Sequence, residues 1–579
     1  MFRQQNRFSF VFALCAVLAA SAASAAEYSV STAQELVDKL SEINPKNKSG
    51  NVIVLQKGNY DVSSYAMPWY RGTTEKPSES HISASKVKLR GATGNPRDVV
   101  IYGDGTKRIL WVDEAVLESL TISNGYTSAN TTAKASGAGI YSDSSHPGTL
   151  TNVIITCCSA NHTGSNGGAY GGAIRYGTLY NCQVIGNSAY GPSNNGNGGG
   201  VLETGAGTTL MVTNCTFASC AADNDGGGIC YAKSLTGCTF TDCEAGRYGG
   251  GADHSELTAD CTFNTSNAKD SGGGAKLYNA NDVIRNCTFY QCKANNYGGG
   301  VQGTSRKGIV EKCNFIECKA DVNGGGGDAL GMVTDCTFTS CTARDCAGGI
   351  CNTAKVSGST FSGCQAENKW GGGLHNVTSI ERCKFEGCFA NWNGGGIDNA
   401  NEIWSCLFVN NSCGGDGGGA NYVVNGGVGC VNCTFVGNTC GSGKKTEAVG
   451  NMPSVRNCLF YLNAAADVVD KNGNYAVTDS KVFASTTDYH LRLDYEEVEK
   501  MVAVKPESAS GRLDCDGAPL VGTIAGMSFY YPGCYAYVPW MAKGLEVNVD
   551  DDVIRPFTAT LSSLRETLQA ISERPDAAP

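Results

Sequence analysis

The sequence predicts an all-β fold in which short coils stack into a parallel β-helix solenoid. Between about Leu150 and Phe460 the chain repeats one unit, made of an apolar residue, then Cys-Thr-Phe-x-x-Cys, then a glycine triplet. From Cys215 onward the first cysteines of successive units lie 23 to 27 residues apart, with Ser359 in one of the slots. Such periods are typical of stacked repeats, in which each unit contacts only its neighbours.

Each unit opens with an alternating segment that predicts a short strand with one buried face. In the segment 310–315 (Val-Glu-Lys-Cys-Asn-Phe), cysteine and phenylalanine share one side and asparagine takes the other. The glycine triplet suits a tight corner, because glycine tolerates positive φ and close backbone approach. Stacking then predicts one internal ladder of phenylalanines: Phe217, Phe240, Phe263, Phe289, Phe315, Phe338, Phe361, Phe385, Phe408, Phe435 and Phe460.

The N-terminal end predicts an export signal followed by a helical cap. Arg3 and Arg7 precede the apolar run 8–20 and the small residues 23–25, which is the order of a secretory signal. Residues Ala33 to Ile43 carry apolar side chains at helical spacing, so we expect an amphipathic helix that covers the first coil. After removal of the signal, no run of about 18 apolar residues predicts a membrane-spanning segment.

Two parts of the chain resemble known β-helix proteins. Residues 52–60, 87–91 and 99–103 look like the opening coils of pectate-lyase-like right-handed β-helix proteins, a resemblance that implies a right-handed solenoid. The repeats resemble the passenger repeats of chlamydial polymorphic outer-membrane proteins, which pair Gly-Gly-Ala-(Ile/Leu/Val) with Phe-x-x-Asn. Residues 171–174 match the first motif and residues 408–411 the second, although most units carry Cys at the Asn position. That family implies a surface-displayed adhesin.

We expect five segments along the chain. They are a signal peptide at 1–26, an N-terminal cap with the first coils at 27–115, the repeat β-helix at 116–465, a small capping or closing segment at 466–540, and a C-terminal tail at 541–579. Residues 488–491, 514–519 and 532–535 resemble the closing segment of secreted bacterial β-helix proteins. Within the tail, residues 561–571 have a short amphipathic helix pattern.

The 29 cysteines predict a buried thiol ladder. Equivalent Cβ atoms in neighbouring parallel strands are about 4.8 Å apart, beyond the roughly 3.8 Å that a disulfide prefers. A buried cysteine then acts as a small hydrophobic residue. Disulfides stay open as an alternative for Cys515 with Cys534, outside the ladder, and for Cys413 with Cys440, in neighbouring coils. Zinc spacing with accompanying histidines is absent from the sequence, so we expect neither a metal nor a cofactor.

The repeats contain none of the residue sets that mark polysaccharide-cleaving enzymes of this fold. The polygalacturonase sets Asn-Thr-Asp, Asp-Asp, Gly-His-Gly and Arg-Ile-Lys do not occur there, so we predict no catalytic residue. One column offers an alternative, in which Cys351, His375 and Asp398 would act as nucleophile, base and orienting group. We interpret this column as a variable, outward-facing ladder. Its members are Cys230, Asp253, Lys276, Gln302, Asp328, Cys351, His375, Asp398 and Asn421.

Four aromatic residues beside the glycine triplets are the candidate binding residues: Tyr248, Tyr297, Trp370 and Trp392. Aromatic faces suit sugar rings or protein partners. The formal net charge of −10, without a basic cluster, argues against nucleic acid as a partner. We therefore expect a secreted or cell-surface protein, extracellular or at the outer membrane. We expect it to be adhesin-like and non-enzymatic, and to bind glycans or host or cell-surface proteins. The alternative is a carbohydrate-active polysaccharide lyase or hydrolase with an unrecognised site.

Overall fold

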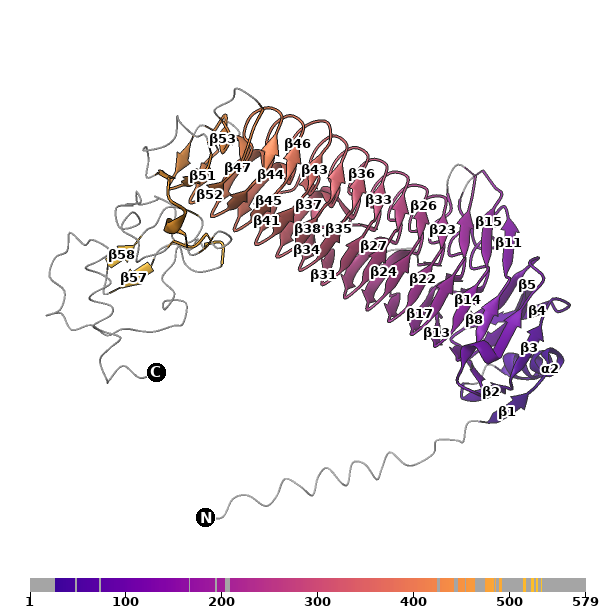
Figure 1. Ribbon diagram of the computed structural model, residues 1–579. Helices are drawn as coiled ribbons and strands as arrows, with labels where there is room; N and C mark the ends of the chain where they lie inside the picture. Colours follow the sequence, from indigo (N-terminus) through magenta and orange to yellow (C-terminus); the bar gives the residue numbers. More distant parts are fainter. Residues whose placement is uncertain are drawn as a thin grey trace, which may run out of the picture. The chain divides into compact units, whose positions relative to one another are not determined.

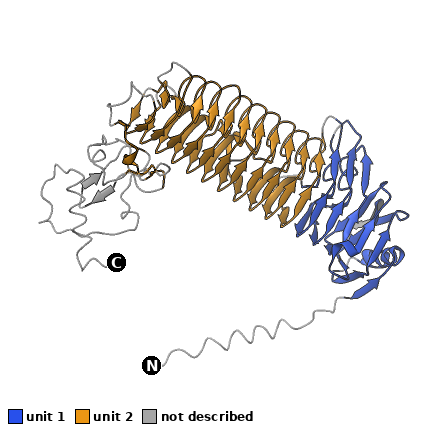
Figure 2. Ribbon diagram, viewed as in Figure 1, with its two compact units in different colours: residues 1–193, 200–203 blue, residues 194–199, 204–579 orange. Residues whose placement is uncertain are grey.

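The protein is a parallel β-solenoid of about 16 turns with an α-helix at its N-terminal end (Figure 1). The computed structural model describes residues 26–46, 49–71, 74–165, 167–192, 195–203, 209–423, 427–441, 446–452, 454–463, 474–483, 485, 489–491, 514–516, 522–524, 527–529 and 533. The predicted all-β parallel fold is confirmed. Among these residues, no helix has the length and apolar character needed to cross a membrane. The chain divides into two compact units, Met1–Ser193 with Gly200–Glu203 and Asn194–Gly199 with Thr204–Pro579 (Figure 2).

The first unit begins with the predicted helix, which is confirmed as α2 (Ala33–Ile43). Thr32 caps this helix, because its Oγ1 accepts a hydrogen bond of 3.2 Å from the backbone N–H of Glu35. The apolar face of α2 is buried and packs against β2 (Asn51–Leu55) and β3 (Gly58–Asp61), so the helix covers the first coil as expected.

Parallel strands build the rest of the first unit, apart from one antiparallel hairpin between β4 and β5. In addition to β2 and β3, the strands are β1 (Glu27–Val30), β4 (Met67–Arg71), β5 (Thr74–Ser85), β6 (Val87–Gly91), β7 (Val99–Tyr102), β8 (Arg108–Asp113), β9 (Val116–Glu118), β10 (Thr121–Ser123), β11 (Tyr126–Ala129), β12 (Ile140–Ser142), β13 (Gly148–Thr151), β14 (Ile154–Thr156), β15 (Ser159–His162), β16 (Ile174–Arg175), β17 (Gly177–Tyr180), β18 (Gln183–Ile185), β19 (Ser188–Tyr190) and β20 (Val201–Leu202).

The coils of the second unit build three parallel sheets, of which the third ends at β49. Sheet 1 contains β21 (Met211–Thr213), β24 (Ile229–Thr236), β27 (Ala252–Ala259), β30 (Ala275–Lys276), β31 (Val283–Arg285), β34 (Val301–Glu311), β37 (Gly327–Thr334), β40 (Ile350–Cys351), β41 (Lys355–Ser357), β44 (Leu374–Glu381), β47 (Ile397–Trp404), β50 (Ala420–Val423), β51 (Gly429–Val431), β53 (Val449–Gly450) and β54 (Val455–Arg456).

Sheets 2 and 3 hold the short strands that follow. Sheet 2 contains β22 (Thr216–Ala218), β25 (Thr239–Thr241), β28 (Thr262–Asn264), β32 (Thr288–Tyr290), β35 (Asn314–Ile316), β38 (Thr337–Thr339), β42 (Thr360–Ser362), β45 (Lys384–Glu386), β48 (Leu407–Val409), β52 (Thr434–Val436), β55 (Leu459–Tyr461) and β56 (Tyr475–Val477). Sheet 3 contains β23 (Ala221–Ala222), β26 (Glu244–Ala245), β29 (Asn267–Ala268), β33 (Lys293–Ala294), β36 (Lys319–Ala320), β39 (Thr342–Ala343), β43 (Gln365–Ala366), β46 (Phe389–Ala390) and β49 (Ser412–Cys413). A separate antiparallel pair is β57 (Gly522–Ile524) with β58 (Met527–Phe529).

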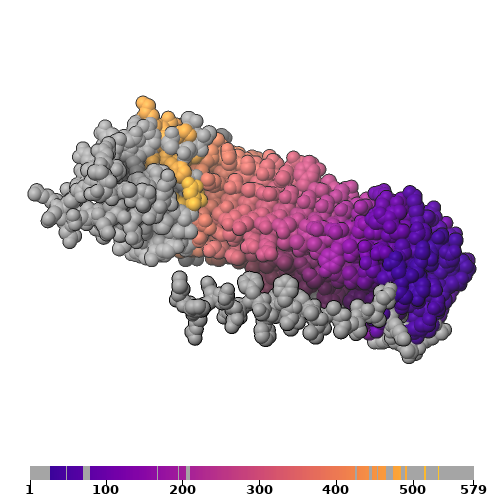
Figure 3. Space-filling view, turned by 90° about the horizontal axis from the view of Figure 1, so that it is seen from below, coloured from indigo at the N-terminus to yellow at the C-terminus, as the bar shows by residue number. Residues whose placement is uncertain are grey.

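The predicted phenylalanine ladder forms the core of the second unit. Neighbouring rings from Phe217 to Phe460 stack with centroids 4.6 to 5.3 Å apart and planes within 3 to 9° of parallel. This spacing is close to the separation of hydrogen-bonded strands, so strand register imposes the stack. All these rings are buried. The space-filling view shows the outer surface of this unit on one face (Figure 3).

The three glycines of a triplet are required for different reasons. In the triplet 249–251, Gly249 has φ of +62°, which L side chains rarely adopt. A Cβ on Gly250 would overlap the backbone carbonyl oxygens of Asn267 and Gly273. A Cβ on Gly251 would overlap the ring of Phe263. The triplet therefore combines a turn, close backbone approach and room for the phenylalanine stack.

The cysteines form the predicted buried ladder. Their thiols make the same hydrogen bond to the backbone that an asparagine side chain makes at this position. The Sγ of Cys364 donates to the carbonyl oxygen of Phe338 at 3.5 Å. Further along the same column, Nδ2 of Asn411 donates to the carbonyl oxygen of Phe385 at 3.0 Å. Cys therefore occupies the Asn position of the Phe-x-x-Asn motif because both side chains can bond the same backbone carbonyl.

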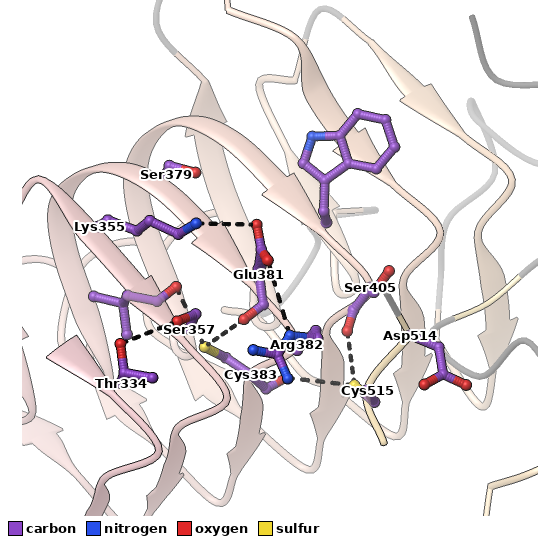
Figure 4. Close-up of polar contacts among 12 residues, drawn as sticks. Thr334, Lys355, Ser357, Ser379, Glu381, Arg382, Cys383, Ser405, Asp514 and Cys515 are labelled. Carbon is purple, nitrogen blue, oxygen red and sulfur yellow. Dashed lines mark hydrogen bonds and ion pairs between the residues drawn. The ribbon is translucent and has the colours of Figure 1, made fainter. Parts of the chain in front are cut away.

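One described residue of the closing segment, Cys515, lies on the outer face of sheet 2. Leu407, Val409 and Val436 point outward there and pack with Cys515, where earlier coils carry polar residues. The Sγ of Cys515 donates to the carbonyl oxygen of Ser405 at 2.7 Å (Figure 4). The predicted partner Cys534, the signal peptide up to residue 25 and the tail 541–579 lie outside the described residues.

Truncating the phenylalanine stack is expected to destabilise the protein strongly. Phe338→Ala should lower the free energy of unfolding by about 3–5 kcal/mol, because a cavity would open between two stacked rings. Thr339→Ala changes an exposed residue of the same strand and should have little effect. Urea and thermal denaturation of both variants measure the difference. Equal losses of stability would contradict the inward orientation of Phe338.

Candidate functional site

The column interpreted above as outward-facing is mostly buried, which corrects that prediction; only Gln302 and His375 among its members are partly exposed. Asp253 has 0% exposure, and Cys230, Asp328 and Asp398 are also buried. The glycine corner explains this burial: a Cβ on Gly249 would lie 2.8 Å from the Cβ of Asp253. The column side chains therefore occupy the room that the missing glycine side chains leave.

The densest polar cluster on this column lies in the coils that carry β24, β27 and β30. We call it the polar corner and define it by its eight residues: Asp225, Cys230, Arg247, Tyr248, Asp253, His254, Lys276 and Tyr278. Three of them belong to the column identified in the sequence and Tyr248 is one of the aromatic candidates, whereas the other four were not predicted. One signal could have revealed His254: the chain has only six histidines, and this one follows a glycine triplet by three residues.

Asp253 is the centre of the polar corner. Its Oδ2 accepts a hydrogen bond from Nδ1 of His254 and another, of 3.6 Å, from Sγ of Cys230. Strand register brings these groups together, since Cys230 of β24 pairs with Asp253 of β27. His254 follows directly with φ of 53°, so its ring turns back toward the corner. An aspartate that fixes a histidine in this way selects its tautomer and leaves Nε2 as the reactive nitrogen.

Two tyrosines hold the His254 ring in place. The ring stacks on Tyr278 with centroids 3.4 Å apart and on Tyr231 with centroids 4.2 Å apart. Two cations flank another ring of the corner: Nζ of Lys276 lies 2.9 Å and the guanidinium of Arg247 lies 4.3 Å from the centroid of Tyr248. The corner therefore contains a fixed imidazole, two cations and two carboxylates.

Burial shifts several pKa values in the corner. Burial, reinforced by the charge of Asp253, raises the pKa of Asp225 to about 7. Burial lowers the pKa of Lys276 to about 8, against the opposing effect of nearby carboxylates. Burial also raises the pKa of the Cys230 thiol well above its usual value. Two groups thus titrate near neutral pH, as is typical of functional sites.

The alternative constellation of Cys351, His375 and Asp398 forms only in part. Nδ1 of His375 donates to Oδ2 of Asp398 at 3.1 Å. Cys351 instead packs into an apolar cluster with Cys346, and no hydrogen bond joins it to His375 in the described structure. Burial raises the pKa of the Cys351 thiol well above its usual value, whereas a nucleophile needs the thiolate.

The column one position further contains a ladder of asparagines, Asn352, Asn376 and Asn399. Nδ2 of Asn376 donates to Oδ1 of Asn352 at 2.7 Å, and Nδ2 of Asn352 donates to Asp328 at 2.9 Å. Asn352, Asn376 and Asn399 have φ of 53°, 54° and 60°, a region that asparagine tolerates better than most residues. The ladder is structural.

The four aromatic candidates do not form one surface. Tyr248 is engaged by Lys276 and Arg247 within the polar corner. Tyr297 is 37% exposed and lies two coils further along the same column. Ser271, in the coil between them, forms a β-bridge with Tyr248 and another with Tyr297. Trp370 and Trp392 do come together: their rings meet edge to face with centroids 5.4 Å apart, and Trp392 is 51% exposed.

The disulfide candidates are placed only in part. Cys440 packs against the buried cluster that contains Cys413, so the two residues are close, as expected for neighbouring coils. The described structure records no disulfide between them. Cys515 is buried against the backbone of Ser405. Oxidation of either predicted pair stays a prediction.

Three groups among the described residues have ligand atoms close enough to hold a metal ion, within 4.8 Å of one another. They are Cys230 with Asp253 and His254, Cys430 with Cys433 and Cys458, and Asp113 with Glu114 and His146. The first combines three different donors and belongs to the polar corner. The second consists of thiols in the buried ladder.

Comparison with known proteins supports the fold. A sequence-family profile described as "Right handed beta helix region" matches residues 234–390, which supports the predicted handedness. No curated protein matches the sequence.

The solved structures that match this chain include carbohydrate-active enzymes. One is a mannuronic acid-specific polysaccharide family 6 lyase from human gut microbiota, at 13% identity and a TM-score of 0.29, covering 78% of this chain and 91% of that chain. A second is the PL6 family alginate lyase AlyGC, at 13% identity and a TM-score of 0.27, covering 78% and 53%. A third is the catalytic domain of a GH87 alpha-1,3-glucanase in complex with tetrasaccharides, at 11% identity and a TM-score of 0.22, covering 75% and 69%. At such low similarity these matches do not extend to a site or an activity.

The raised pKa of Asp225 predicts a pH-dependent contribution to stability. The folded protein holds this proton up to about pH 7, whereas the unfolded chain loses it near the ordinary pKa of 3.8. The contribution is therefore full below pH 3.8 and is lost as the pH rises through about 7.

We expect the stability of the wild type, relative to that of Asp225→Asn, to fall between these pH values. Thermal denaturation across this range measures the difference. Asp335→Asn, an exposed site, serves as control and should run parallel to the wild type. A parallel curve for Asp225→Asn as well would contradict the raised pKa.

Proposed function

We propose that this chain is a secreted or cell-surface β-helix protein that binds glycan chains, and that Trp370 and Trp392 form its contact surface. The observation that carries the proposal is the edge-to-face tryptophan pair, in which Trp392 is exposed and Trp370 is partly buried. The Trp392 indole faces solvent, whereas the Trp370 indole packs against the buried cluster that contains Cys351. Indole rings offer large apolar area at low cost in side-chain entropy, which suits the C–H faces of sugar rings.

Polar groups beside the tryptophans support the choice of glycans over purely apolar partners. The Trp370 ring stacks on His375 with centroids 5.5 Å apart. His375 donates to Asp398, which also accepts from Nδ2 of Asn421 at 2.7 Å. A platform of aromatic rings next to fixed hydrogen-bonding groups matches a ligand that has both apolar faces and hydroxyl groups.

Export and an adhesin-like role are parts of the same proposal. The order of charge, apolar run and small residues at the N-terminus supports export. The resemblance of the repeats to surface-displayed passenger repeats supports display outside the cell. A regular solenoid offers the same corner in every coil, so binding residues can be added without changing the fold.

A second candidate function is a polysaccharide lyase or hydrolase, and the polar corner favours it. Asp225 and Lys276 have pKa values of about 7 and about 8, and His254 is fixed by Asp253. Proton transfer at neutral pH needs groups of this kind. The two candidates use different residues, so they can be tested separately.

Removing the tryptophan pair is expected to weaken glycan binding. A glycan array on the mature protein identifies the ligand, and calorimetry then gives Kd for the variants. Trp370→Ala with Trp392→Ala should raise Kd at least about thirtyfold, corresponding to about 2 kcal/mol for buried aromatic anchors. Tyr290→Ala removes an aromatic of sheet 2 that is 39% exposed and should leave Kd within about twofold. An unchanged Kd in the double variant would exclude this surface.

The enzymatic alternative is tested by product release from the same glycans. Under the binding proposal, the wild type should release neither reducing ends nor unsaturated sugars. Release that is lost in His254→Ala but retained in the double tryptophan variant would replace the binding proposal with the catalytic one.

A further inference from the structure

Asp253 carries a carboxylate whose surroundings are incomplete. The residue is fully buried, and its Oδ1 has no hydrogen-bond partner among the described residues. Its Oδ2 meanwhile accepts hydrogen bonds from both Nδ1 of His254 and Sγ of Cys230. A buried carboxylate oxygen without a partner is costly, and native proteins rarely leave one. The Oδ1 side of Asp253 can therefore accept a hydrogen bond or bind a cation.

The groups around Asp253 form a mixed donor set. The Cys230 thiol, the His254 imidazole and the Asp253 carboxylate each offer one ligand atom, and these atoms lie within 4.8 Å of one another. Sulfur, nitrogen and oxygen donors together suit zinc and related transition metals better than calcium or magnesium, which prefer oxygen alone. We propose that Cys230, Asp253 and His254 bind one divalent transition-metal ion of the zinc type.

The fold holds these donors before any ion arrives. Strand pairing fixes the register of Cys230 opposite Asp253, and the stacks on Tyr231 and Tyr278 fix the plane of the His254 ring. Ligands held by packing and by outer contacts bind metal more tightly than mobile ones. Asp225 brings a second carboxylate to the corner, and its Oδ1 is also buried without a hydrogen-bond partner in the described structure.

Charge balance is compatible with an ion at this position. Binding requires the Cys230 thiol to release its proton to solvent, since the thiolate is the ligand. One thiolate and one carboxylate then neutralise a divalent ion. Lys276, which pairs with Asp253 in the next coil, contributes the opposing cation in the metal-free protein. Affinity should therefore increase with pH.

The other two donor groups fit less well. In the thiol group, Cys433 and Cys458 already donate to the carbonyl oxygens of Val431 at 3.4 Å and Arg456 at 3.3 Å. All three of its thiols are buried in the core. In the group of Asp113, the Glu114 side chain is 47% exposed, and exposed acidic groups are common without a metal.

Cobalt(II) provides a direct test, because a thiolate bound to it produces a charge-transfer absorption band. Mature protein freed of metal with a chelator is titrated with cobalt(II), and zinc(II) is then added to displace it. We expect one ion per chain and a charge-transfer band that zinc(II) abolishes. Cys230→Ser should remove the band and weaken zinc(II) binding at least about tenfold.

Matched variants separate this site from the others. Cys351→Ser replaces an equally buried cysteine of the same column and should leave the band intact. His254→Gln changes a half-buried side chain, so it should fold, weaken zinc(II) binding and keep the thiolate band. Circular dichroism checks that each variant is folded.

Two outcomes would overturn the proposal. One is the absence of a band in the folded wild type. The other is a band that persists in Cys230→Ser and disappears in Cys458→Ser, which would place the ion in the thiol ladder. Glycan binding by Trp370 and Trp392 should not change with zinc(II), so failure of one proposal is distinguishable from failure of the other.

Discussion

The rest of this structure depends on one constraint: each coil is hydrogen-bonded to the next in register, at the spacing of neighbouring strands. Because equivalent positions recur at nearly the same distance, any side chain that faces inward must stack on the equivalent side chain of the next coil. The phenylalanine stack satisfies this condition with flat rings, and the cysteine columns satisfy it with thiols that bond backbone carbonyls. Residues that cannot stack inside are confined to the outer faces and corners.

The glycine corners link this constraint to the candidate sites. A corner without side chains lets the backbone of the next coil and the phenylalanine ring approach closely. The same absence of side chains creates room outside the coil, and the column residues Cys230, Asp253 and Lys276 fold into it. Polar groups thereby become buried without entering the core, which is why their pKa values can shift while the stack remains apolar.

The two proposed sites use this corner differently. Around Asp253, neighbouring coils supply charged groups that face one another, and burial tunes them. Around Trp370, neighbouring coils supply two indole rings: Trp392 is exposed to solvent, and Trp370 stacks on His375. Since each coil contributes one residue to each column, a change in a single repeat alters the local chemistry without disturbing the strands on either side.

The sequence by itself determined the stacked fold, the inward phenylalanines, the buried cysteines and the helix at Ala33–Ile43. These features follow from local alternation and from a period that strand spacing makes unavoidable. Only the tertiary structure decided that Asp253 is buried, that the Lys276 ammonium lies over the Tyr248 ring, and that Cys515 packs against Leu407. Those outcomes depend on residues with left-handed backbone conformation, such as His254, and on which side chains adjacent coils bring together. The pattern within one repeat does not specify the side chains of the neighbouring repeats.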